Sequence, residues 1–106
     1  MISDARMEKA LTFLAESDEE YAEKKTDVER QAWVKEQAEY RVFQLSEGNI
    51  QERKAQAALS GDVSEATERW LKAMLEAKKL EAKRQTQVLI IEAWRSLNAN
   101  RRVGHV

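Results

Sequence analysis

Residues that break helices are almost absent from this sequence. It contains no proline and only three glycines in 106 residues, and the stretch from Asp62 to Asn98 holds neither residue. As one continuous helix, that stretch would be roughly 54 Å long, because each helical residue adds about 1.5 Å. Ala, Leu, Glu, Lys, Arg and Gln dominate the composition, which is typical of long helices and coiled coils. We therefore predict an all-α chain.

Gly48 and Gly61 divide the sequence into two long arms and a short tip. Glycine commonly ends a helix by adopting the left-handed conformation just beyond the last turn. Each of these glycines is therefore a predicted helix stop, and the connection between the arms is short. The sequence predicts a single domain over residues 1–106, a long antiparallel helical hairpin with a short N-terminal helix and a short helix at its tip.

Capping residues place the predicted helix ends. Ser3 can cap the N-terminal helix, and Ser17 with Glu20 has the spacing of a capping box, which predicts a break in the first arm and a second helix beginning there. Asn49 and Glu52 have the same spacing at the start of the tip helix, predicted over residues 49–60. Asp62 or Ser64 is the expected cap of the last helix.

The last helix changes character along its length. On a 100° wheel its first half has one charged face, made of Glu65, Glu68, Arg69, Lys72, Glu76, Lys79 and Lys83. Farther along, Ile90, Trp94 and Leu97 occupy that face, so this end is apolar all round and must be covered on every side. We expect the cover to come from the N-terminal helix, through Met7, Leu11, Phe13 and Leu14.

Two arginines, Arg84 and Arg95, lie within an apolar track of the last helix. A buried charge without a partner is very costly, so each needs an acidic partner if it is buried. The antiparallel arrangement predicts Glu29, Glu36 or Glu39 as that partner.

Each arm carries two apolar tracks, although one neighbouring helix can cover only one of them. A second copy of the chain would cover the others, which predicts a homodimer in a helical bundle. The candidate stripe for the dimer or for another partner contains the large apolar residues Trp33, Tyr40, Phe43, Leu71 and Leu75.

Charge is distributed unevenly along the chain: residues 1–47 carry 7 Lys and Arg against 12 Asp and Glu, and residues 48–106 carry 11 against 7. The plainer interpretation is that an acidic and a basic helix lie side by side. The alternative is a nucleic-acid contact, with the tip as a helix-turn-helix reader rather than a simple connector. Its candidate residues are the exposed-looking cations Lys72, Lys79, Lys83, Arg53, Lys54, Arg101 and Arg102.

Several functional classes lack support in the sequence. There is no cysteine, one histidine (His105), no nucleotide-binding motif and no metal-ligand spacing. No segment approaches the ~20 apolar residues of a membrane span. We therefore expect a cytoplasmic protein that is not an enzyme, binds no cofactor, metal or small-molecule substrate, and does not associate with a membrane.

Three stretches together carry a resemblance: Met7-Glu8-Lys9-Ala10-Leu11, Ile50-Gln51-Glu52-Arg53-Lys54-Ala55-Gln56-Ala57, and residues 84–102 around Ile90-Ile91-Glu92-Ala93-Trp94. In this order they resemble small helical proteins of tailed bacteriophages and prophages, found among genes for recombination and single-strand DNA handling. The resemblance implies a phage origin and a role in phage DNA metabolism, without a catalytic site. The expected function is a helical scaffold that binds a protein partner, such as a phage recombination or replication protein. The alternative is direct nucleic-acid binding.

Overall fold

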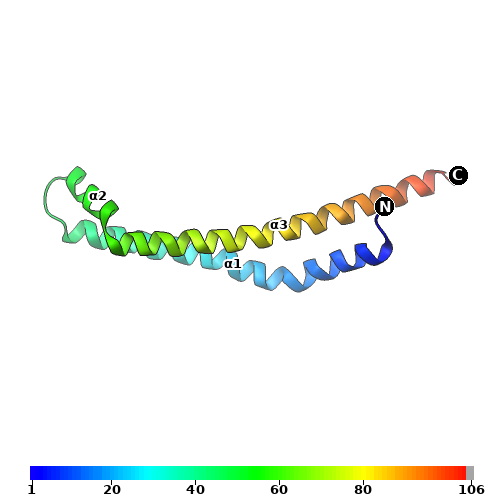
Figure 1. Cartoon of the computed structure of the whole chain (residues 1–106), viewed down its shortest axis with the longest axis horizontal. Coiled ribbons are helices and arrows are strands. Elements are labelled where there is room, and N and C mark those ends of the chain that lie inside the picture. The colour runs from blue at the N-terminus through cyan, green and yellow to red at the C-terminus, as the bar shows by residue number, and fades with distance from the viewer. Residues whose placement is uncertain (105–106) are drawn as a thin grey trace. The chain divides into compact units, whose positions relative to one another are not determined.

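The chain is all helical in its computed structural model, which describes residues 1–104 and the side chains of residues 1–101 (Figure 1). Helix α1 spans Asp4–Leu45, α2 spans Ile50–Leu59 and α3 spans Gly61–Gly104. No strand occurs in this part of the chain, so the all-α prediction is confirmed.

The helices contribute to two compact units. Unit 1 combines Met1–Ala22 with Lys78–Val106, and unit 2 is Glu23–Ala77. Both α1 and α3 pass from one unit into the other without interruption. The single-domain expectation stays a prediction.

Helix α1 begins as the sequence predicts but does not break where a break is predicted. The backbone N–H of Arg6 donates to Ser3 Oγ at 3.2 Å, so Ser3 caps the helix. The predicted second start at Ser17 is wrong, because α1 continues through it and Ser17 is buried. No glycine or proline ends the preceding turns, and Ser17 Oγ accepts a hydrogen bond from Arg84 of α3 instead of capping a helix.

The tip has the predicted helix, bounded by one glycine rather than two. Gly48 has a φ of +108°, and Asn49 then caps α2 by accepting from the Glu52 N–H at 2.9 Å. The Gln56 amide also donates to the Glu47 carbonyl at 3.0 Å, which holds the turn against α2. Gly61 does not end α2: the helix ends at Leu59, and Gly61 is the first residue of α3.

Small side chains make the core of unit 2. Ala38 of α1 and Val63 and Ala66 of α3 form a buried cluster, with Val34 and Val42 packed against it. Beside this cluster, the Lys35 ammonium lies 5.4 Å from the centre of the Trp70 ring and 2.7 Å from Glu39 Oε1. These contacts fix one face of α1 against α3 and leave the opposite face outside the core.

Unit 1 pairs an acidic segment with a basic one. Residues 1–22 carry six acidic and two basic side chains, whereas residues 78–106 carry two acidic and seven basic ones. The Trp94 indole N–H donates to Asp4 Oδ1 at 2.8 Å, and Ala10, Leu80 and Ile91 are buried. Within this unit, α1 and α3 run in opposite directions, because Asp4 meets Trp94 while Asp18 meets Arg84. This arrangement agrees with the plainer interpretation of the charge distribution.

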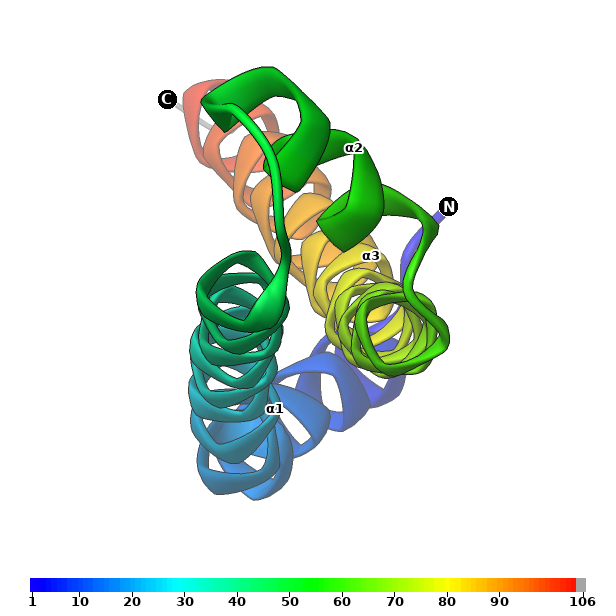
Figure 2. The same cartoon turned by 90° about the vertical axis from the view of Figure 1, so that its left-hand side faces the viewer.

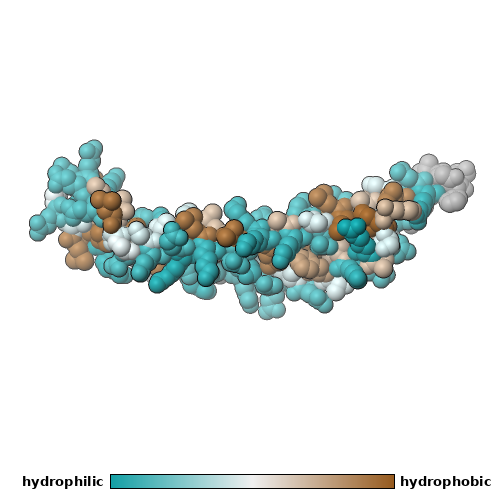
Figure 3. Space-filling model, in the orientation of Figure 1, coloured by the Kyte–Doolittle hydropathy of each residue, from teal (hydrophilic) through white to brown (hydrophobic). Residues whose placement is uncertain are grey.

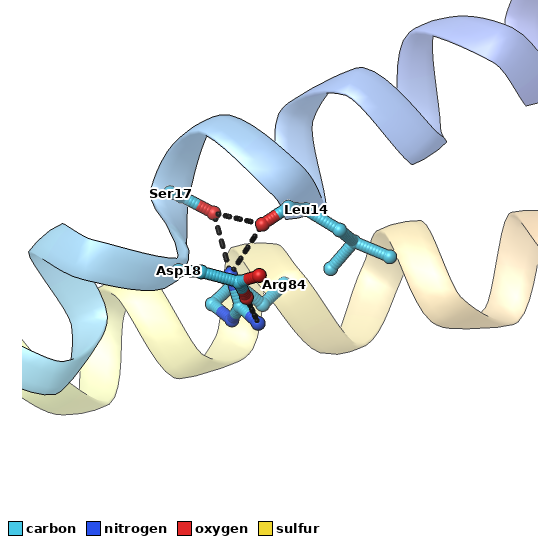
Figure 4. Close-up of polar contacts among 4 residues, drawn as sticks. All are labelled: Leu14, Ser17, Asp18 and Arg84. Carbon is cyan, nitrogen blue, oxygen red and sulfur yellow. Dashed lines mark hydrogen bonds and ion pairs between the residues drawn. The ribbon is translucent and has the colours of Figure 1, made fainter.

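Arg84 joins the two segments of unit 1 through three acceptors (Figure 4). Its guanidinium donates to the Leu14 carbonyl at 2.9 Å, to Ser17 Oγ at 2.7 Å and to Asp18 Oδ1 at 2.5 Å. The Tyr21 ring lies 5.0 Å away, measured from its centre to the guanidinium carbon. An acidic partner was expected, but Glu29, Glu36 and Glu39 were the wrong candidates. The sequence predicts Asp18 in the first turn of a second helix, so it was not considered as a partner of Arg84.

The apolar end of α3 is covered on one side only. Ile91 is buried and Ile90 and Trp94 are half-buried, but Leu89 and Leu97 are exposed. The expectation of complete cover is therefore wrong for the single chain, since one neighbouring helix shields one side. Arg95 is also exposed, so it does not need the acidic partner that burial would require.

Replacing Gly48 by alanine should destabilise the fold, whereas the same change at Gly61 should not. A side chain at a φ of +108° is strained, and its Cβ would collide with the Glu52 side chain. We expect Gly48→Ala to lower the free energy of unfolding by about 1–2 kcal/mol. A Cβ at Gly61 would meet no neighbouring atom within 4 Å, so Gly61→Ala should stabilise by about 0.4–1 kcal/mol. Urea unfolding of both variants at one protein concentration measures this, and equal effects would contradict it.

Replacing Arg84 by leucine should also destabilise the chain, because three hydrogen bonds to a charged donor are lost. The expected decrease in the free energy of unfolding is about 1–3 kcal/mol, moderated by the exposure of Asp18. Arg95→Leu is the matched control on the same helix and should stay within about 0.5 kcal/mol of the wild type. Thermal and urea unfolding give the comparison. If Arg84→Leu were as stable as the wild type or more so, Arg84 would not hold the two segments together.

Candidate functional site

The most exposed aromatic side chains lie on α1 in unit 2. Trp33 is 61% exposed and Tyr40 is 62% exposed. They are seven residues apart, close to two full turns, and so share one face of the helix. This face is turned away from Ala38 by more than a third of a turn, which explains why neither ring joins the core.

The other members of the predicted stripe are also outside the core, but on a different helix. Leu71 is 46% exposed and Leu75 is 52% exposed, both on α3. On the face in view in Figure 3, apolar residues form small groups separated by hydrophilic ones. Four of the five residues of the predicted stripe are therefore exposed, two on α1 and two on α3 of unit 2.

Phe43, the fifth member of the stripe, is half-buried because α2 lies beside it. A groove of about 520 Å³ separates the two helices. Figure 2 views unit 2 from the end at which α2 connects α1 to α3. The groove is lined by all three helices, with Glu36, Glu39, Tyr40 and Phe43 from α1, Lys54, Ala57 and Ala58 from α2, and Val63 from α3. The groove thus has a mainly apolar lining with charged side chains of both signs.

Arg53 and Lys54, the predicted readers at the tip, have different surroundings. The Arg53 guanidinium carbon lies 5.7 Å from the centre of the Phe43 ring, and its Nε is buried with no hydrogen-bond partner. Arg53 is therefore half-buried against α1, which limits its reach to a ligand. Lys54 is exposed and lines the groove.

The predicted basic face is divided between the two units. Lys72 belongs to unit 2, where it lines a hollow of about 260 Å³ together with charged residues of both signs, Lys24, Asp27, Arg69 and Glu76. Lys79 and Lys83 are exposed and belong to unit 1. Anions near Lys72 would oppose a phosphate at that position.

The candidate residues of the C-terminal tail are described only in part. Arg101 is exposed, and its guanidinium lies 3.6 Å from the Met1 sulfur. The side chain of Arg102 and all of His105 lie outside the described residues. Hence the structure brings Arg101 close to the beginning of the chain.

Comparisons with protein families, with curated proteins and with solved structures found no match to this chain. Among the described residues, no group of three or more acidic or histidine side chains could hold a metal ion. No helix in the described range has both the length and the hydropathy of a membrane span. Function is therefore inferred from the exposed surfaces of the two units.

Sequence reasoning missed the groove because it treated α2 as a connector or a DNA reader. The residues carry a partial signal: Ala57 and Ala58 are small, and Glu36, Glu39, Tyr40 and Phe43 recur at spacings of three and four on one side of α1. The wheel cannot show on which side of α1 the tip helix lies. That choice depends on the turn after Leu45 and on the packing of Ala57, which is buried.

Proposed function

We propose that this chain is a non-enzymatic accessory protein that binds another protein through the exposed apolar side chains of unit 2. The observation that carries the proposal is the exposure of Trp33 and Tyr40 on one face of α1. Removing large aromatic side chains from water lowers the free energy of a complex, and tryptophan and tyrosine are frequent hot spots of protein interfaces. Leu71 and Leu75 extend the exposed apolar area on α3.

The partner that we propose is a phage recombination or replication protein in the cytoplasm of a bacterial host. The support is the sequence resemblance to small helical phage proteins carried by residues 7–11, 50–57 and 84–102. The finer architecture in this proposal is a long antiparallel hairpin that dimerises into a helical bundle.

Replacing Trp33 by alanine should weaken binding to that partner without unfolding the chain. Tagged wild-type protein in a lysate of phage-infected cells should enrich one phage protein, which is then purified and titrated against each variant. We expect Trp33→Ala to raise the Kd by at least about tenfold. Glu16→Ala, a change at an exposed position of the same helix that belongs to unit 1 and lies outside the proposed surface, should leave it unchanged. The proposal fails if both variants bind the purified protein equally.

Direct nucleic-acid binding is the second candidate. It is favoured by the seven basic residues against two acidic ones in residues 78–106, where Lys79 and Lys83 are exposed. Against it are the acidic neighbours of Lys72 and the position of Arg53 over Phe43. These two observations make protein binding the better-supported function.

A salt series separates the two functions. Under the main proposal, fluorescence anisotropy detects no binding to single- or double-stranded DNA at low salt. Phosphate contacts by Lys72, Lys79 and Lys83 would instead give a slope of about −3 when the logarithm of the association constant is plotted against the logarithm of the salt concentration. If such binding occurred and the triple change of these lysines to glutamate abolished it, direct nucleic-acid binding would replace protein binding as the function.

A further inference from the structure

The groove of unit 2 carries two opposite charges that the chain itself does not pair. Glu36 lines it from α1 and Lys54 lines it from α2, and both are exposed. By contrast, Glu39 on the same side of α1 is held by Lys35 at 2.7 Å. Among the described residues, neither Glu36 nor Lys54 has an ion-pair partner within 4.0 Å. One acid and one base thus remain available on two sides of an apolar depression.

A surface of this kind is complementary to itself. In a dimer with twofold symmetry, the same patch of both copies meets, so residue i of one chain contacts residue j of the other and the reverse contact forms as well. A patch with one sign of charge repels its own copy, whereas a patch with both signs can pair each acid with the partner's base. Glu36 and Lys54 meet this requirement.

The apolar lining supplies the favourable part of the contact. Tyr40 is mostly exposed and Phe43 is half-buried, and the exposed Ala58 faces the groove from α2. Covering these side chains removes apolar surface from water. The α1 side of the groove thus carries large rings and Glu36, and the α2 side carries a small alanine and Lys54. A ring from a second chain can pack over the alanine.

We propose that this groove is the surface through which two copies of the chain associate, with Glu36 of each copy paired with Lys54 of the other. The inference rests on the proposed interaction role and names a second copy of the chain as one partner. Trp33 does not line the groove, so a different protein can contact Trp33 outside it, and Tyr40 belongs to both surfaces.

Charge reversal on purified full-length protein tests this pairing. Glu36→Lys alone places two lysines opposite each other at both contacts, and Lys54→Glu alone places two glutamates there. Each variant should weaken self-association by at least about tenfold. An equimolar mixture should recover it, because every contact between the two variants pairs opposite charges. The double variant Glu36→Lys/Lys54→Glu should recover it too.

The readout is the mass in sedimentation equilibrium over a micromolar concentration range, compared with 12.3 kDa for one chain. Circular dichroism checks that each variant is folded. Glu29→Lys and Arg41→Glu make the same charge changes at exposed positions of α1 outside the groove, and both should associate like the wild type.

Three results would overturn the inference. The wild type could remain at 12.3 kDa throughout, the single variants could associate as strongly as the wild type, or the mixture could show no recovery. None of these results bears on the Trp33 experiment, which uses a different residue and a different partner. A monomer that binds the phage protein through Trp33 would therefore remove this inference and the proposed dimer, and leave the proposed binding of another protein in place.

Discussion

A helix packed against one neighbour can bury only one of its sides, and most of this chain consists of two such helices. The consequence is a thin core: six of the nine buried apolar residues in the described part are alanines, and no large side chain there is fully buried. Alanine allows close approach between helices but removes little apolar surface from water. The exposed aromatic and leucine side chains follow from the same geometry, because helical periodicity places them where no second neighbour exists.

Specific polar contacts compensate for the thin core at defined points. In unit 1, the Arg84 guanidinium binds the Leu14 carbonyl, Ser17 and Asp18, and the Trp94 indole binds Asp4. Such contacts require one axial alignment of the two segments, which an alanine-rich contact surface by itself specifies weakly. In unit 2, Lys35 has a similar role between Trp70 and Glu39.

The sequence was sufficient for features that depend on nearby residues and insufficient for those that depend on distant ones. Ser3, Gly48 and Asn49 act as predicted, because capping and left-handed turns are local. The break at Ser17 was wrong since a contact with Arg84, 67 residues away, competes with the local cap. The groove could not be predicted for a similar reason: helical periodicity places residues on faces but does not determine which face α2 covers.

The contacts of the two units join residues at different separations along the sequence. In unit 2, Gln56 contacts Glu47, nine residues earlier in the sequence, and Lys35 contacts Trp70, 35 residues later. In unit 1, the partners of Arg84 and Trp94 are 66 to 90 residues distant along the sequence. Loop-closure entropy increases with this separation, although slowly. Unit 1 is therefore entropically the harder of the two to close from a disordered chain, and the ordering of unit 2 shortens the span that unit 1 must close.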